Sequence, residues 1–200
     1  MGHNIERRKS TRKPLKRFYL VCEGKNTEPN YFEALVAHFA LTTINLIPVG
    51  GSGAPQTIVA KAISISAGLD RKHSFEEGDE VWAVFDCDLH EQYESARNDC
   101  RQKGIHLAYS NPCFELWLIL HHELYEKSDD HHAVQRHYAT LDPHYSKCNG
   151  KNCDFSLLSA HVERAEKFAI QQLNNRAAQM RHEGRPSTTV HLLTAKLRGS

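Results

Sequence analysis

Acidic side chains follow two apolar runs of the chain, at the points where strands are expected to end. Glu23 comes directly after the run 18–22, and Asp86 and Asp88 follow the run 81–85. Because ligands of an open parallel sheet gather at the carboxyl ends of its strands, we expect these carboxylates to lie close together. Residues two apart on an extended chain point the same way, so Asp86 and Asp88 can share one ligand. Converging acids repel one another unless a cation compensates, and oxygen-only ligands select a hard ion such as Mg²⁺ or Mn²⁺.

Two further glutamates stand where they could add oxygens to such a site. Glu28 lies at the start of the helix expected after the first strand, and Glu115 at the start of the helix expected after the fourth. An Asp-x-Asp pair alone often marks only a loop with a helix cap, but its combination with a strand that ends in Glu-Gly is more specific. Such a hard ion usually keeps several water ligands and also binds phosphate.

These carboxylates must be positioned by strands and helices that alternate along the chain. Apolar runs with β-branched and aromatic residues predict strands over 18–22, 44–49, 81–85 and 105–109. Apolar residues at helical spacing predict helices after the first, second and fourth strands, and the polar segment 91–103, closed by Gly104, predicts a helix after the third. Ser110-Asn111-Pro112 is expected to cap the fourth helix. This order is typical of an α/β fold with a mostly parallel central sheet flanked by helices.

From residue 121 onward the pattern is helical. Helices are expected over 131–141, 156–174 and 190–197, the last capped by Ser187-Thr188-Thr189. Phe114, Trp117 and Leu118 at helical spacing are expected to lie in the core. We therefore predict three parts, which are a basic flexible arm over 1–14, an α/β domain over 15–125 and a helical C-terminal extension over 126–200 packed on it.

The near-neutral charge of the chain hides an asymmetry. Of the 25 Lys and Arg residues, seven lie within residues 1–17, which contain a single acid, so the rest of the chain carries 18 basic and 23 acidic residues. The basic arm is expected to contact nucleic-acid phosphates, with a solubilising tail as the alternative. The expected contacts are Arg7, Arg8, Lys9, Arg12, Lys13, Lys16 and Arg17, with Lys25 beside Glu23.

The cysteines and the apolar runs indicate the cellular compartment of the protein. No run approaches the ~20 apolar residues that span a bilayer, and no apolar stretch of a secretory signal precedes Phe18. We therefore expect a cytoplasmic protein whose six cysteines form no disulfides.

Cys148 and Cys153 could hold zinc with histidines among His121, His122, His131 and His132. Because no second pair of cysteines with matching spacing exists, a polar loop is the favoured interpretation.

Several of these segments resemble known family motifs. Residues 21–28, with Glu23-Gly24-Lys25-Asn26-Thr27-Glu28, resemble the glutamate motif of Toprim domains in the form used by OLD-type nucleases. Residues 84–88 resemble the Toprim Asp-x-Asp motif. Residues 110–118 and 186–191 resemble the signature and the C-terminal motif of the RloB-like family of Toprim-like proteins. The resemblance extends from about residue 12 to residue 197 and implies a Toprim-like Rossmannoid fold.

The resemblance also implies a function. RloB-like proteins are expected to be metal-dependent nucleases, cutting RNA such as tRNA, or DNA, as effectors of prokaryotic anti-phage defence beside a partner ABC- or AAA-type ATPase. By position, Glu23, Asp86 and Asp88 take the catalytic and metal-binding roles with Mg²⁺ or Mn²⁺. Glu28 matches the second glutamate of the OLD-type motif, and Glu115 falls within the RloB-like signature. The third aspartate of some Toprim proteins is absent, because position 90 is a histidine.

Two other functions fit the same residues. One is a catalytically silent Toprim-like subunit that docks on an ATPase and binds nucleic acid. The other is a different phosphotransfer enzyme such as a primase, against which the absence of a zinc-binding primase module in the sequence argues. A homo-oligomer is compatible with all three.

Overall fold

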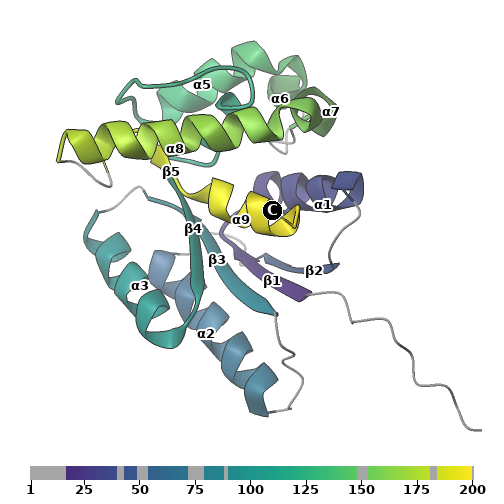
Figure 1. Ribbon diagram of the computed structural model, residues 1–200, viewed down its shortest axis with the longest axis vertical. Helices are drawn as coiled ribbons and strands as arrows, with labels where there is room; N and C mark the ends of the chain where they lie inside the picture. Colours follow the sequence, from purple (N-terminus) through teal and green to yellow (C-terminus); the bar gives the residue numbers. More distant parts are fainter. Residues whose placement is uncertain are drawn as a thin grey trace, which may run out of the picture.

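The computed structural model describes residues 17–39, 43–48, 54–71, 79–87, 90–147, 153–180 and 184–199, and these contain one sheet of five strands (Figure 1). The strands lie in the order β2-β1-β3-β4-β5. They are β1 (Arg17–Cys22), β2 (Thr43–Pro48), β3 (Glu80–Asp86), β4 (His106–Asn111) and β5 (Ser187–Thr188). β1 to β4 are parallel, and β5 pairs antiparallel with β4. The predicted α/β fold with a mostly parallel sheet is confirmed.

Helices cover both faces of this sheet (Figure 1). α2 (Pro55–Arg71) and α3 (His90–Lys103) pack on one face, and α1 (Thr27–Phe39) and α9 (Val190–Leu197) pack on the other. Side chains of a strand alternate between the faces, so Leu20 and Val84 join the α1 side whereas Val21 and Ala83 join the α2 side. Burial on both faces explains the continuous apolar runs 18–22 of β1 and 81–85 of β3.

The remaining helices form an outer layer beyond α9 and the short α4 (Glu115–Ile119). They are α5 (His131–Leu141), α6 (Pro143–Lys147), α7 (Phe155–Leu158), the 3₁₀ turn η1 (Ser159–His161) and α8 (Val162–Ala178). The single helix predicted over 156–174 is therefore divided at η1. α5 packs on α4, and α8 packs on α9 and β5. No helix in the described part of the chain combines the length and the hydrophobicity that a membrane span requires.

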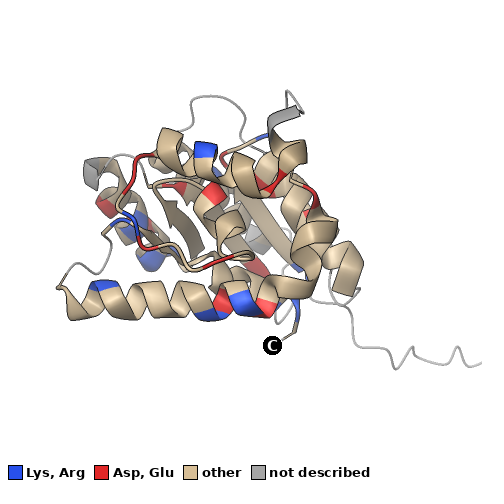
Figure 2. Cartoon of the chain, turned by 90° about the horizontal axis from the view of Figure 1, so that it is seen from above, with Lys and Arg blue, Asp and Glu red and all other residues tan. Residues whose placement is uncertain are grey.

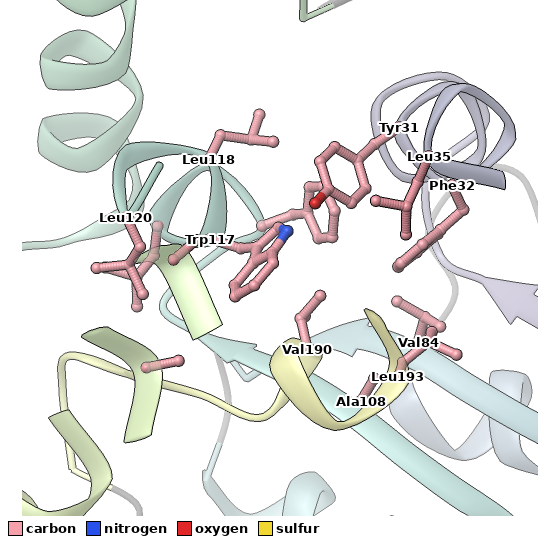
Figure 3. Packing of buried hydrophobic residues seen from close by; sticks show 14 of the residues in the cluster. Tyr31, Phe32, Leu35, Val84, Ala108, Trp117, Leu118, Leu120, Val190 and Leu193 are labelled. Atoms are coloured by element: carbon pink, nitrogen blue, oxygen red, sulfur yellow. The ribbon is translucent and has the colours of Figure 1, made fainter. Parts of the chain in front are cut away.

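Trp117 occupies the centre of the core between the helices α1 and α9, which cover the sheet, and the outer layer (Figure 3). Its side chain is fully buried and meets the rings of Tyr31 and His121 edge to face. The Nδ1 atom of His121 lies 3.0 Å from the Trp117 carbonyl oxygen and donates to it, so its Nε2 accepts from the Tyr31 hydroxyl at 3.0 Å. Burial lowers the pKa of His121 to about 3, which keeps the ring neutral. The predicted core position of Trp117 is confirmed, and both ring nitrogens of His121 are engaged within the protein.

Substituting Trp117 with alanine is expected to lower the free energy of unfolding by about 3–5 kcal/mol, because the change removes a buried indole and leaves a cavity. Urea unfolding followed by circular dichroism measures this loss. Leu192→Ala is the matched control, because Leu192 is 50% exposed on α9 and an exposed substitution shifts stability by only about 0.5 kcal/mol. Equal losses in both variants would contradict the central role of Trp117.

The structure corrects the role predicted for two polar segments. Ser110 and Asn111 lie in β4, and α4 begins after Phe114 without a side-chain cap. Ser187 and Thr188 form β5, a strand that the sequence does not reveal. The Thr188 hydroxyl donates to the Tyr109 carbonyl at 2.9 Å and accepts from Ser110 at 2.9 Å. It also accepts the N–H of Val190 at 3.3 Å, so this segment both extends the sheet and begins α9.

Candidate functional site

The pairing of β1 with β3 brings Glu23 and Asp86 together at the carboxyl end of the sheet. Cys22 stands opposite Val84, and the Glu23 N–H donates to the Val84 carbonyl at 3.0 Å. The Asp86 N–H in turn donates to Oε2 of Glu23 at 3.0 Å, which fixes this carboxylate above β3. The strand order reverses between β1 and β3, and such a switch point is where open α/β sheets bind ligands.

Glu28 joins this site from the first turn of α1. Its side chain is buried, and its Oε1 accepts the Gly24 N–H at 3.2 Å. Burial, with smaller contributions from the charges of Glu115 and Glu23, raises the pKa of Glu28 to about 7. A Cβ on residue 24 would overlap the carboxylate of Glu28, so only glycine permits this approach.

Substituting Gly24 with alanine is expected to weaken Mn²⁺ binding by about 10–100-fold, the usual effect of disturbing a group that orients a metal ligand. The added methyl displaces the end of the flexible Glu28 side chain rather than backbone, so the fold should be retained. Isothermal titration with Mn²⁺ measures the affinity. Gly68→Ala in α2 is the control, because a Cβ there meets nothing within 4 Å. Unchanged Mn²⁺ affinity in Gly24→Ala would show that this contact has no role.

Glu115 reaches the site from the start of α4 and is held by the outer helices. Its buried carboxylate accepts a short hydrogen bond from the Tyr145 hydroxyl and one of 3.5 Å from Nε2 of Gln135. Burial and the charge of Glu115 raise the pKa of Tyr145, so this phenol stays protonated and remains a donor. Tyr145 and Gln135 are site residues that the sequence analysis missed.

The four carboxylates described above line one pocket of about 330 Å³. Its walls carry four carboxylates, one ammonium group, side-chain amides and one aromatic ring. The lining residues are Glu23, Gly24, Lys25, Asn26, Thr27, Glu28, Asp86, Phe114, Glu115 and Gln135. The structure therefore brings together four of the five predicted metal ligands, and the exposed Lys25 beside them. The fifth, Asp88, lies outside the described residues.

The donors around the pocket are chemically suited to Mg²⁺ or Mn²⁺. They are carboxylate oxygens, which these hard cations prefer, and a cation would relieve the repulsion that contributes to the raised pKa of Glu28. Within the described part of the chain, no three Asp, Glu, His or Cys side chains stand close enough to hold one ion. The described carboxylates thus fit such an ion by their chemistry and must move closer, or be joined by Asp88, to hold it.

The predicted nucleic-acid contacts fall in different places. Arg17 begins β1 at the opposite edge of the sheet, where its Nε and Nη2 donate to Oδ2 of Asp79 at 2.9 and 2.6 Å. This buried partner gives Arg17 a structural role, and its contact with nucleic acid stays a prediction. The other six basic residues of residues 1–17 lie outside the described residues. In Figure 2 the described Lys and Arg residues appear as scattered short patches.

Comparison with known protein families identifies the family of this chain. A family model described as RloB-like protein matches residues 18–197, which is most of the chain. No curated protein and no solved structure matches it.

Proposed function

Because the chain belongs to the RloB-like protein family, we propose that it is a divalent-metal-dependent nuclease. The observation that carries the proposal is the pocket at the switch point between β1 and β3, where Glu23, Glu28, Asp86 and Glu115 face one space. The segments that contribute Glu23 and Asp86 are those that resemble the Toprim motifs. We further propose that the protein acts in the cytoplasm as the effector of an anti-phage defence system, with an ABC- or AAA-type ATPase as partner.

The residues of the pocket would have different roles in cleavage. Glu23, Glu28, Asp86, Glu115 and Asp88 would hold Mg²⁺ or Mn²⁺, which when bound neutralises phosphate charge and assists attack by water. The Asp86 N–H holds the Glu23 carboxylate in place, where Glu23 either binds the ion or takes a proton from the water. Tyr145 orients Glu115 through its hydrogen bond. Lys25, which is exposed and lines the pocket, would contact the phosphate next to the scissile bond.

A panel of nucleic acids tests this proposal. Purified protein is incubated with tRNA, single-stranded RNA, single-stranded DNA and duplex DNA in Mg²⁺, Mn²⁺ or EDTA, with and without the proposed ABC- or AAA-type ATPase partner. We expect at least one substrate to be cut, and EDTA to abolish cutting. If no substrate is cut under any of these conditions, the protein is not a nuclease acting alone or with that partner.

A catalytically silent subunit that binds nucleic acid is the second candidate. It is favoured by one observation, which is that no three metal-binding side chains of the described residues stand close enough to hold an ion. This candidate predicts nucleic-acid binding without cleavage, and equal binding with and without divalent metal. The panel above therefore separates the two functions.

A further inference from the structure

We propose that Arg185 is a phosphate-binding residue that holds the backbone of a nucleic acid along the carboxyl edge of the sheet, to one side of the carboxylate pocket. The inference rests on the proposed function in one respect, which is that nucleic acid is the ligand. It adds a contact from the C-terminal part of the chain, which neither the basic arm nor the pocket supplies.

The strand pairing places Arg185 at the same edge of the sheet as Asp86. Asp86 stands opposite Ser110 in β4, and Asn111 stands opposite Ser187, the first residue of β5. Because β5 runs antiparallel to β4, the chain enters it at the carboxyl edge, and Arg185 lies two residues before that entry. Two strand spacings of ~4.8 Å put β5 about 10 Å from β3. This distance corresponds to about three nucleotides of a stacked single strand.

Both ends of Arg185 are fixed. The side-chain Nε donates to Oδ1 of Asn111 at 3.1 Å, and Asn111 is fully buried. The backbone carbonyl accepts from the Ser128 hydroxyl at 2.8 Å and from Nη1 of Arg176 at 3.1 Å. Arg176 is itself held in place by an ion pair with Glu126. The guanidinium is thus oriented before any ligand arrives.

The partner of this guanidinium is a neutral amide rather than a carboxylate. Three other arginines of the described residues are neutralised by acids, Arg17 by Asp79, Arg176 by Glu126 and Arg198 by Glu163 and Glu166. Within the same part of the chain, Arg185 forms no ion pair with Asp or Glu. Asn111 therefore orients the group and leaves its charge available, and the two Nη nitrogens can bind the paired oxygens of a phosphate.

The salt dependence of binding tests this assignment. Affinities of wild type and Arg185→Gln for a fluorescently labelled 20-nucleotide single strand, as RNA and as DNA, are measured in EDTA between 50 and 200 mM salt. Loss of one phosphate contact is expected to weaken binding and to reduce the slope of log K against log salt by about 0.7. Arg101→Gln is the matched control, because Arg101 is exposed in the last turn of α3, at the opposite edge of the sheet. It should leave the slope unchanged.

A second variant keeps the test independent of any loss of side-chain packing. Asn111→Asp retains the shape of the partner but neutralises the guanidinium in place, so it should reduce the slope as Arg185→Gln does. Unchanged slopes in both folded variants, on RNA and on DNA, would overturn the inference, as would a wild-type protein that binds neither strand. Because EDTA prevents cleavage, these outcomes are separate from the nuclease assay. A slope that depends on Arg185 in a protein that cuts nothing supports this inference and contradicts the nuclease proposal.

Discussion

Replacing Glu23 by glutamine is expected to lower metal-dependent cleavage by about 10²–10⁴-fold, the contribution typical of a positioned proton acceptor. The amide oxygen of glutamine can still accept the hydrogen bond that the Asp86 N–H gives to Glu23 at 3.0 Å. The substitution therefore removes the negative charge and the basic oxygen but keeps the contact that joins β1 to β3. A loss of this size with an unchanged thermal unfolding temperature assigns the effect to chemistry rather than to folding.

Asp86→Asn extends the experiment to the neighbouring strand. The carboxylate of Asp86 is expected to hold the metal. Cleavage by Asp86→Asn should therefore fall at least as far as cleavage by Glu23→Gln, and it should not recover when a base such as imidazole is added. Glu94→Gln on the exposed surface of α3 is the control for the loss of one negative charge, and its cleavage should equal that of wild type. Undiminished cleavage in both Glu23→Gln and Asp86→Asn would place the active centre elsewhere.

Much of the pocket follows from local rules. The alternation of apolar strands with helices predicts parallel strands, and a parallel pair must carry the residues after Cys22 and Phe85 to the same edge of the sheet. Glu28 follows as well, because the first turn of α1 begins close to the end of β1. The sequence pattern is sufficient to place these residues because each of them lies within a few positions of the end of a predicted strand or the start of a predicted helix.

The groups that orient Glu115 could not be predicted in this way. Tyr145 and Gln135 lie thirty and twenty positions from it along the chain, in helices that pack on the sheet layer through tertiary contacts. Nothing in their local sequence distinguishes them from other polar residues of amphipathic helices. The ion pair of Arg17 with Asp79 could not be predicted either, because it is also a tertiary contact. A cluster of basic residues does not show which of them pairs with a distant acid.

The missed strand β5 shows a related limit. Ser and Thr before an apolar helical segment favour a cap by their side-chain hydrogen bonding, and a strand of two residues has no periodicity to detect. β5 exists because the free edge of β4 is available to it. The hydroxyl of Thr188 in β5 contacts Tyr109 and Ser110. These contacts position the preceding chain so that Arg185 can donate to Asn111.

Replacing Glu28 by glutamine is expected to stabilise the metal-free protein at pH 8 by up to about 3 kcal/mol, because folding raises the pKa of Glu28 from about 4.5 to about 7. The folded state therefore holds a proton that the unfolded state releases between these two values. Wild type loses stability as the pH rises from about 4.5 to 7, by ~1.4 kcal/mol for each pH unit in this interval. Glutamine is neutral at every pH and avoids this loss, and its amide oxygen can still accept the Gly24 N–H.

Urea unfolding of both proteins in EDTA from pH 4.5 to pH 8 measures the difference. The buried His121, whose pKa of about 3 makes the folded state lose stability below pH 6.5, affects wild type and variant equally. The difference between the two curves should therefore be near zero at pH 4.5 and largest at pH 8. A constant difference across this range would contradict the raised pKa of Glu28.

Saturating Mn²⁺ should reverse the order of stability. A ligand that binds the folded state stabilises it in proportion to the logarithm of its affinity, and wild type is expected to bind Mn²⁺ more tightly because Glu28 supplies a charged oxygen. Proton and metal then compete for the same carboxylate, so Mn²⁺ affinity of wild type should rise by up to about tenfold per pH unit as the pH approaches 7, and that of Glu28→Gln should rise less. If Mn²⁺ stabilises both proteins equally at pH 8, Glu28 is a buried acid of the pocket but not a metal ligand. In that case Glu23, Asp86 and Glu115 would hold the ion without Glu28.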